Sequence, residues 1–209
     1  MLRILAVIAV VTGVVLDATG TSTLTGLLPY FTIQSNVLYG IFAAYALFQG
    51  RNTNPVLKGA VTLYVAITGL VFHLVLDNPA SGFANAPVDR TPGEAVANQL
   101  LHTVVPLIAV ADWLLFDEHR RFKVRYAAWW LAFPLYYLVF AMIRGLITDT
   151  YPYPFLDVHD LGYAGVAVSA VFFAVAFWLL GLSFVGLDRL AHRVTGGRRA
   201  EADDRVSTT

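Results

Sequence analysis

The chain has no cysteine among its 209 residues, which excludes disulfide bridges, thiolate metal ligands and a cysteine nucleophile. Covalent catalysis would therefore have to use Ser, Thr, Asp, Glu, Lys, His or Tyr. Charged residues are also scarce, since they make up 13% of the chain against about 25% in soluble domains. Because 57% of the residues are hydrophobic, the composition is typical of an integral membrane protein.

The chain shows no excess of either charge, since 14 basic residues balance 14 acidic ones. A basic surface for nucleic acid is therefore not indicated, and we expect no nucleic-acid partner. The sequence also contains no GxGxxG motif, no phosphate-binding loop and no convincing internal repeat. We accordingly expect no cofactor.

Six segments are apolar over roughly the length of about 20 residues that a helix needs to cross a bilayer. The sequence thus predicts an all-α integral membrane protein, in which residues 1–187 form a bundle of six transmembrane helices. The polar remainder, 188–209, is expected to be a cytoplasmic tail that becomes disordered after a short helical extension. The predicted spans are Leu2–Leu16 (extendable to Thr19), Leu27–Phe48, Val56–Leu76, Ala97–Phe116, Tyr126–Ile147 and Leu161–Leu187.

Basic residues fall almost wholly at one set of span ends, and this asymmetry predicts the orientation. The opposite loops contain Arg90 as their only basic residue, so we expect a multi-pass protein of the cell membrane with both termini cytoplasmic. A cleaved signal peptide is the alternative for the first span, but the following Leu-Asp-Ala-Thr-Gly offers no good cleavage site. The cytoplasmic basic residues are Arg3, Arg51, Lys58, Arg120, Arg121, Lys123, Arg125, Arg189, Arg193, Arg198, Arg199 and Arg205; the outer acidic ones are Asp17, Asp77, Asp89, Glu94, Asp149, Asp157 and Asp160.

Polar side chains inside the predicted spans gather near the outer ends. With a rise of about 1.5 Å per residue, Thr32, His73, His102 and Arg144 fall in one layer, and the last outer loop adds Asp157. Ionisable and polar groups within a membrane are costly and mark functional sites by default. This layer is therefore the candidate site.

Helical spacing places further polar residues beside Thr32 and His102. Asn98 and Gln99 precede His102 by four and three residues, so all three share one helix face. Asn36 follows Thr32 by four residues and shares its face in the same way. The amides of Asn98 and Gln99 are thus candidate donors to a developing negative charge.

Two prolines indicate how the site is arranged. Pro106 follows His102 by four residues, cannot donate to the His102 carbonyl and should bend the helix there. Since freed backbone groups in a membrane face protein or a cavity, we expect His102 to point inward. Pro29 favours a helix start just before Thr32, where free amides could stabilise negative charge.

Each candidate also has an ordinary interpretation. A membrane Thr commonly bonds its own backbone or a neighbouring helix, and Arg144 could extend to the surface instead of binding a carboxylate. The aromatic residues near the span ends, including Tyr153, are mostly expected to be interface anchors. Asp112, near the opposite ends, is interpreted as structural and paired with a loop arginine.

Three segments resemble the androgen-induced and androgen-dependent multi-pass membrane protein family, including its bacterial branch. They are Pro29-Tyr-Phe-Thr-Ile-Gln-Ser-Asn36, Ala97-Asn-Gln-Leu-Leu-His-Thr-Val-Val-Pro106 and Tyr153-Pro-Phe-Leu-Asp157. Animal members are threonine hydrolases of fatty acid esters of hydroxy fatty acids. The resemblance implies that Thr32 is the nucleophile and that His102 is its partner.

The resemblance and the polar layer together lead us to expect a membrane esterase whose partners are a lipid ester substrate and membrane lipids. In this interpretation Arg144 holds a substrate carboxylate, and Asp157, His73 or another acid of the outer loops orients His102. A non-catalytic lipid-binding or transport protein that uses the same pocket is the main alternative. A metal site built from His73, His102 and His159 is the other, although no two histidines have ligand spacing on one helix; we expect no metal.

Overall fold

The computed structural model describes residues 1–20, 23–49, 53–85 and 89–207, with side chains given only as far as Arg193 in the last helix. Arg51, which contributed to the predicted orientation, lies outside the described residues, as do the side chains of Arg198, Arg199 and Arg205. The described residues form helices and short connections, without a strand. This confirms the all-helical prediction.

The helices follow one another along the chain with short turns between them. Two of the segments, η1 and η3, are single π turns that continue an α-helix, and η2 and η4 are 3-10 turns. The elements are α1 (Leu2–Ala18), α2 (Leu24–Leu27), α3 (Phe31–Gln49), α4 (Pro55–Val71), η1 (Phe72–Leu76), η2 (Pro79–Ser81), α5 (Pro92–Gln99), η3 (Leu100–Val104), α6 (Val105–Phe116), α7 (Val124–Trp129), α8 (Ala132–Thr148), η4 (Pro154–Leu156) and α9 (Val158–Ser207).

Five helical segments are long and apolar enough to cross a membrane, which indicates a multi-pass membrane protein. The remaining predicted span corresponds to α1, whose 17 residues reach the lower limit of about 17 for a crossing helix. The last helix continues to Ser207, well beyond the short extension that we expected before a disordered tail. The five segments are Phe31–Gln49, Pro55–Leu76, Pro92–Phe116, Val124–Thr148 and Val158–Arg193.

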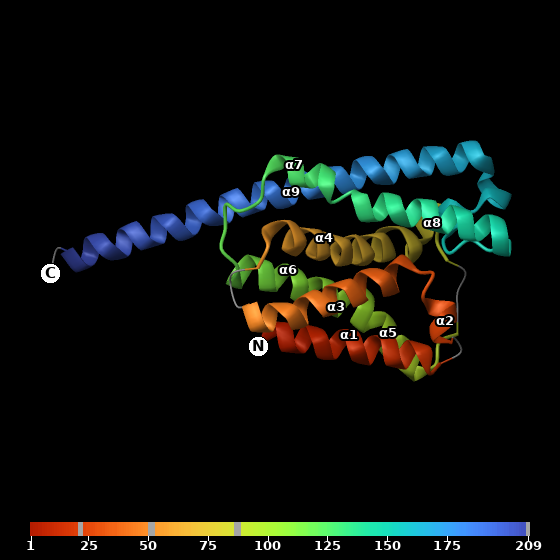
Figure 1. Cartoon of the computed structure of the whole chain (residues 1–209), viewed down its shortest axis with the longest axis horizontal. Helices are drawn as coiled ribbons and strands as arrows, with labels where there is room; N and C mark the ends of the chain where they lie inside the picture. Colours follow the sequence, from red (N-terminus) through yellow and green to blue (C-terminus); the bar gives the residue numbers. More distant parts are fainter. Residues whose placement is uncertain (21–22, 50–52, 86–88, 208–209) are drawn as a thin grey trace.

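Figure 1 shows the long helices side by side, with both ends of the chain toward the same end of the bundle. α1 packs against α3, α5 and α6, and α4 packs against α3, α6 and α9. The end that carries Met1 and Arg3 is called the basic end below, and the opposite end, which carries Asp17, is called the acidic end. Thr32 and His102 lie toward the acidic end.

Local sequence signals explain where several helices begin. The Asn54 side chain accepts hydrogen bonds from the first amides of α4, and Pro55 occupies the first helical position. Thr91 and Glu94 form a reciprocal capping box at the start of α5, again with a proline at the first position. These caps fix the entry of the two helices that carry His73 and His102.

A proline also divides the fifth span. Pro134 cannot donate to the carbonyl of Trp130, and the regular α-helical hydrogen-bond pattern is interrupted between α7 and α8 at Trp130 and Leu131, although both residues keep right-handed helical backbone angles. The amide of Leu131 instead reaches back three residues to the Ala128 carbonyl at 3.2 Å. The predicted fifth span is therefore interrupted by a short turn between α7 and α8, while Val124–Thr148 together remains one apolar segment long enough to cross a membrane.

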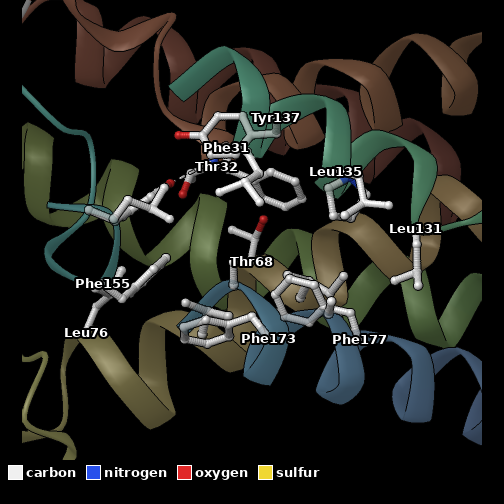
Figure 2. A pocket seen from close by; sticks show the side chains of 18 of the residues that line it. Phe31, Thr32, Thr68, Leu76, Leu131, Leu135, Tyr137, Phe155, Phe173 and Phe177 are labelled. Carbon is white, nitrogen blue, oxygen red and sulfur yellow. Dashed lines mark hydrogen bonds between the residues drawn. The ribbon is translucent and has the colours of Figure 1, made fainter. Parts of the chain in front are cut away.

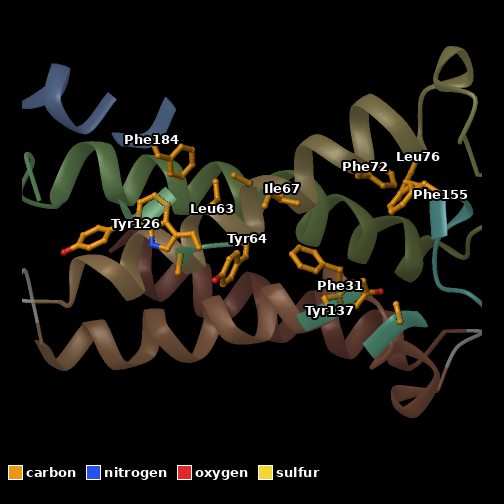
Figure 3. Close-up of a cluster of buried hydrophobic side chains, with 14 of the residues drawn as sticks. Phe31, Leu63, Tyr64, Ile67, Phe72, Leu76, Tyr126, Tyr137, Phe155 and Phe184 are labelled. Carbon is orange, nitrogen blue, oxygen red and sulfur yellow. The ribbon is translucent and has the colours of Figure 1, made fainter. Parts of the chain in front are cut away.

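Buried aromatic and aliphatic side chains form the main core between α3, α4, α7, α8 and α9. In Figure 3 this core extends along the bundle from Tyr126 and Phe184 to Phe72 and Phe155. Lipid tails are as apolar as these side chains, so close packing rather than escape from water holds such helices together. Glycines permit that packing: a Cβ on Gly59 would overlap the Trp130 ring, and one on Gly181 would lie 3.2 Å from the Ala127 Cα.

Four charged side chains gather at the basic end, with Lys58 and Asp112 buried and Arg3 and Asp117 partly buried. Arg3 of α1 contacts Asp112 at 3.1 Å and Asp117 at 2.8 Å. Lys58 of α4 pairs with Asp112, and its Nζ lies 3.0 Å from Asp117. Asp112 is thus structural, as expected, but its partners come from two helices rather than from a loop. The cluster joins α1, α4 and the end of α6.

Candidate active site

Thr32 occupies the first turn of α3, because the chain turns through Leu28–Tyr30 and begins the helix at Phe31. Amides in the first turn of a helix have no partner within the helix. The Thr32 amide instead donates to the Tyr153 hydroxyl at 3.4 Å. Pro29 lies two residues before the helix rather than inside its first turn, and its carbonyl accepts from Tyr137 at 2.9 Å.

His102 lies in η3, the π turn between α5 and α6. The extra residue of a π turn shifts side chains around the helix, and such turns are frequent at functional sites. Here the Val105 amide donates to the Leu100 carbonyl, and Pro106 leaves the His102 carbonyl without its usual donor. The expected irregularity at Pro106 is therefore present, as a π turn that precedes the proline.

The Thr32 hydroxyl and the His102 ring are within hydrogen-bonding distance. Thr32 Oγ1 lies 3.1 Å from His102 Nε2, and His102 Nδ1 lies 3.1 Å from the Asn98 carbonyl oxygen. A carbonyl oxygen can only accept, so Nδ1 carries the proton and Nε2 is left as the acceptor. This tautomer is the one that can take a proton from Thr32.

The His102 ring is also held by packing. It stacks on Phe72 of η1, with ring centroids 4.2 Å apart and an angle of 29° between the planes. Gly69, one turn earlier, permits the approach, since a Cβ there would lie 2.9 Å from the His102 carbonyl oxygen. The two π turns thus meet face to face beside Thr32.

Asn36 and Ser35 position the Thr32 turn. The Asn36 side-chain amide donates to the carbonyls of Thr32 at 2.8 Å and Leu101 at 3.2 Å, which joins α3 to the His102 turn. Ser35 donates to the Thr32 carbonyl and lies 2.8 Å from the Thr68 hydroxyl of α4. Asn36 therefore lies beside Thr32, where its spacing along the helix placed it.

A cavity begins at Thr32 and His102 and continues between the helices. Figure 2 shows Thr32 and Tyr137 on one side, Phe173 and Phe177 on the other, and Leu131 toward one end. The space between the lining side chains, its opening included, is about 750 Å³. Its polar groups are Thr32, Thr68, His102, Tyr137 and Tyr153, and its other lining side chains are apolar.

Tyr153 was expected to be an interface anchor, yet it lies inside this site. Its hydroxyl accepts from the Thr32 amide, and its ring stacks on Phe155 with centroids 5.2 Å apart. Burial raises the pKa of Tyr153 above its usual value, so the hydroxyl keeps its proton and can donate it. Its place in the Tyr-Pro-Phe-Leu-Asp segment was the one sequence signal for this role.

A second threonine–histidine contact lies nearby but outside the cavity. His73 Nε2 is 2.9 Å from Thr103 Oγ1, and Thr103 donates to the Gln99 side chain at 3.2 Å. Because the Thr103 proton is directed to Gln99, His73 is the donor in this contact. His73 and Gln99 therefore bond to Thr103 rather than to Thr32 or His102, and Asn98 contributes its backbone carbonyl.

Arg144 and Asp157 are not brought to the pair. Arg144 donates to the Thr150 carbonyl at 2.8 Å from a separate groove along α8, because its position on that helix faces away from the cavity. Asp157 accepts from the His159 amide at 2.9 Å and caps the start of α9. The group that orients His102 is the Asn98 carbonyl, not an acidic side chain or His73.

The described residues contain no cluster of three or more His, Asp or Glu side chains that could hold a metal ion. His73 and His102 each bond a threonine, and His159 lies 3.0 Å from Asp149 in the loop.

The chain matches no protein-family model, and neither a curated protein nor a solved structure is detectably similar to it.

Proposed function

We propose that this protein is an integral membrane hydrolase that cleaves acyl esters of lipids, with Thr32 as the nucleophile and His102 as the general base. The observation that carries the proposal is the contact between Thr32 Oγ1 and the free Nε2 of His102 at the head of an apolar cavity. A hydroxyl becomes a useful nucleophile when an adjacent base can take its proton. An ester with a long acyl chain suits both the polar head and the apolar remainder of the cavity.

In the first step Thr32 Oγ attacks the ester carbonyl carbon while its proton passes to His102 Nε2. The tetrahedral intermediate collapses, the bond to the alcohol oxygen breaks, and the leaving alkoxide takes the proton from Nε2. The alcohol departs and the acyl group remains on Thr32. The Asn98 carbonyl accepts from Nδ1–H throughout, which keeps the ring oriented and favours its transiently charged form.

In the second step a water molecule attacks the acyl carbon and gives a proton to His102 Nε2. The bond to Thr32 Oγ then breaks, Thr32 recovers its proton from His102, and the fatty acid leaves. The same nitrogen thus serves as base and acid in both steps.

The carbonyl oxygen gains negative charge in both steps and needs donors directed at it. The Thr32 amide at the helix start and the Tyr153 hydroxyl lie beside the nucleophile and suit this role. Their mutual hydrogen bond is long at 3.4 Å, so an entering oxygen atom can replace it. Asn98 and Gln99 suit the role less well, because the former acts through its carbonyl and the latter bonds Thr103.

The proposed substrate class is supported by the same cavity and by the resemblance of the Thr32 and His102 segments to threonine hydrolases. Fatty acid esters of hydroxy fatty acids, or related acyl esters, would place one acyl chain in the cavity. The carboxylate of such a substrate would lie elsewhere than at Arg144, which faces away from the cavity.

The proposed orientation has six crossings, with α1 as the first, and places the acidic end on the outer face of the cell membrane. The distribution of basic residues supports this arrangement, as does the position of both chain ends at one end of the bundle (Figure 1). A reporter domain that is active only in the cytoplasm should give a signal when it is fused to either terminus. A signal from a reporter that is active only outside the cytoplasm would contradict this orientation.

A lipid-binding protein without catalysis is the alternative, because the cavity itself would hold an acyl chain. Transport across the membrane is less well supported, since the buried charges at the basic end pair with one another and do not line the cavity. Binding of lipid esters without turnover would favour this alternative.

The test is hydrolysis by the purified protein in detergent, with p-nitrophenyl palmitate and an ester of a hydroxy fatty acid as substrates. We expect turnover that falls by at least about a thousandfold in Thr32→Ala and in His102→Ala. Thr103→Ala is the matched control, because it removes the other histidine-bonded threonine hydroxyl at a similar depth. Equal losses in Thr32→Ala and Thr103→Ala, or turnover retained in folded Thr32→Ala, would contradict the proposal.

A further inference from the structure

Part of the apolar lining of the cavity comes from two facing helices, α8 and α9, and the space between them is called the slot below. Four of its side chains belong to α8 or the residue just before it, and four belong to α9 at the positions i, i+3, i+4 and i+7 that share one helix face. The α9 residues are Ala170, Phe173, Ala174 and Phe177, and those of the facing segment are Leu131, Pro134, Leu135 and Leu138.

The break at Pro134 explains why a slot exists here. Before the break α7 packs closely on α9, where Gly181 meets the backbone of Ala127. After the break α8 packs less closely against α9 than α7 does. The contact at Gly181 therefore closes the slot toward the basic end, and the looser packing of α8 on α9 after Leu131 leaves it open.

The slot also reaches the outer surface of the bundle, where lipid would lie. Leu135 lines it and is nevertheless 48% exposed, and the facing positions on α9 are partly exposed. An acyl chain could enter sideways between α8 and α9 without leaving the apolar phase. The polar head of the cavity at Thr32 would then receive the ester group.

We propose that this slot holds the acyl chain of the substrate and measures its length, with Ala170 and Ala174 setting the usable depth and Phe177 the far end. This inference rests on the proposed esterase activity. The two alanines leave space along the slot because their side chains end at Cβ. Phe177 and Leu131 lie at the end away from Phe155 and Leu76 in Figure 2, and they limit the chain there.

The experiment compares kcat/KM for p-nitrophenyl butyrate, octanoate and palmitate across slot variants. Each methylene that is kept out of an apolar site lowers kcat/KM by about fourfold. In Ala174→Phe we expect the ratio of palmitate to butyrate to fall on the order of a hundredfold with little change for butyrate. Ala170→Phe, nearer to Thr32, should lower the ratio further. Phe177→Ala should change the profile in the opposite direction, with kcat/KM for palmitate rising relative to octanoate.

Val175→Phe is the matched control, since it adds the same ring to α9 at a half-exposed position outside the slot. Its length profile should equal that of the wild type. An active Ala174→Phe with an unchanged profile, or a change equal to that of Val175→Phe, would overturn the slot while leaving the esterase proposal intact. If Ala174→Phe does not fold, an unchanged profile in Phe177→Ala would overturn it instead. A folded wild type without turnover on any ester would refute the esterase proposal itself.

Discussion

At the residue scale, the contact of Thr32 with His102 depends on which nitrogen of the imidazole carries its proton. The Asn98 carbonyl, one turn before His102, decides this by accepting from Nδ1. A backbone carbonyl thus takes the position that an acidic side chain has in many hydrolase triads. Because it carries no full charge, it orients the ring without adding an ionised carboxylate to the membrane, where a charge is costly.

The sequence predicted the Thr32 and His102 positions but not all of their neighbours. Depth along a helix can be counted from the sequence, and this placed both residues in one layer. Direction around a helix is harder to predict: Arg144 lies at the expected depth, yet it faces a separate groove. Tyr153 was missed because loop residues have no periodicity from which to predict where they fold back.

The Tyr153 hydroxyl should contribute to catalysis without contributing much to binding. Removing one donor to a developing oxyanion typically lowers kcat by about a hundredfold or more, so we expect such a loss in Tyr153→Phe with KM nearly unchanged. Steady-state kinetics with a soluble ester measure both constants. Tyr163→Phe, at an exposed position on α9, is the control, and a Tyr153→Phe enzyme with full kcat would remove Tyr153 from the mechanism.

At the scale of the helix, the two π turns η1 and η3 determine where the site lies. Both occur where a span nears the acidic end, and each presents a histidine. Pro106 gave a sequence signal for the irregularity in η3. Pro79 follows His73 by six residues rather than four, so the same spacing signal did not predict η1. The Phe72 ring of η1 nevertheless stacks on the His102 ring and so helps to hold it in place.

Gly69 makes this arrangement possible, so adding a methyl group there should displace the π turn. The new Cβ would lie 2.9 Å from the His102 carbonyl oxygen and 3.2 Å from Pro106. We expect Gly69→Ala to destabilise the protein by about 1–3 kcal/mol, the usual cost of overpacking, and to lower ester hydrolysis. Thermal unfolding in detergent and activity on the same sample measure the two effects.

Gly186→Ala is the control for this substitution, since no neighbouring atom lies within 4 Å of the added group. In a helix interior that change alone should stabilise by about 0.5–1 kcal/mol. A Gly69→Ala protein as stable and as active as the wild type would show that the close approach of α4 to η3 is not needed.

At the scale of the whole molecule, the bundle has a site at the acidic end and an ion cluster at the basic end. The six apolar segments and the charge asymmetry were visible in the sequence because span length and loop charge follow directly from the bilayer. The slot between α8 and α9 was not, because it depends on how far two helices separate after the break at Pro134. The pairing of Arg3 and Lys58 with Asp112 likewise requires the three-dimensional structure.

The ion cluster should hold the first helix onto the bundle. Removing one member of an ion pair should therefore destabilise the protein more than removing both members of the pair. Lys58→Met leaves Asp112 and Asp117 with Arg3 as their remaining cationic partner in the cluster. Loss of one partner from a buried pair costs about 3–5 kcal/mol, so a marked drop in the unfolding temperature is expected. The double variant Lys58→Met with Asp112→Leu keeps the Arg3–Asp117 pair and should regain much of the loss. A double variant no more stable than Lys58→Met would contradict this account.

The most direct test of the central claim is to locate the covalent adduct that a fluorophosphonate forms with the purified wild-type protein. The account predicts that the Thr32 hydroxyl attacks phosphorus, that fluoride leaves, and that tandem mass spectrometry finds the phosphonate on Thr32. The adduct should disappear in Thr32→Ala and in His102→Ala and persist in Thr103→Ala. A folded protein that acquires no adduct, or one that carries it on another residue, would contradict the assignment of Thr32 as the nucleophile.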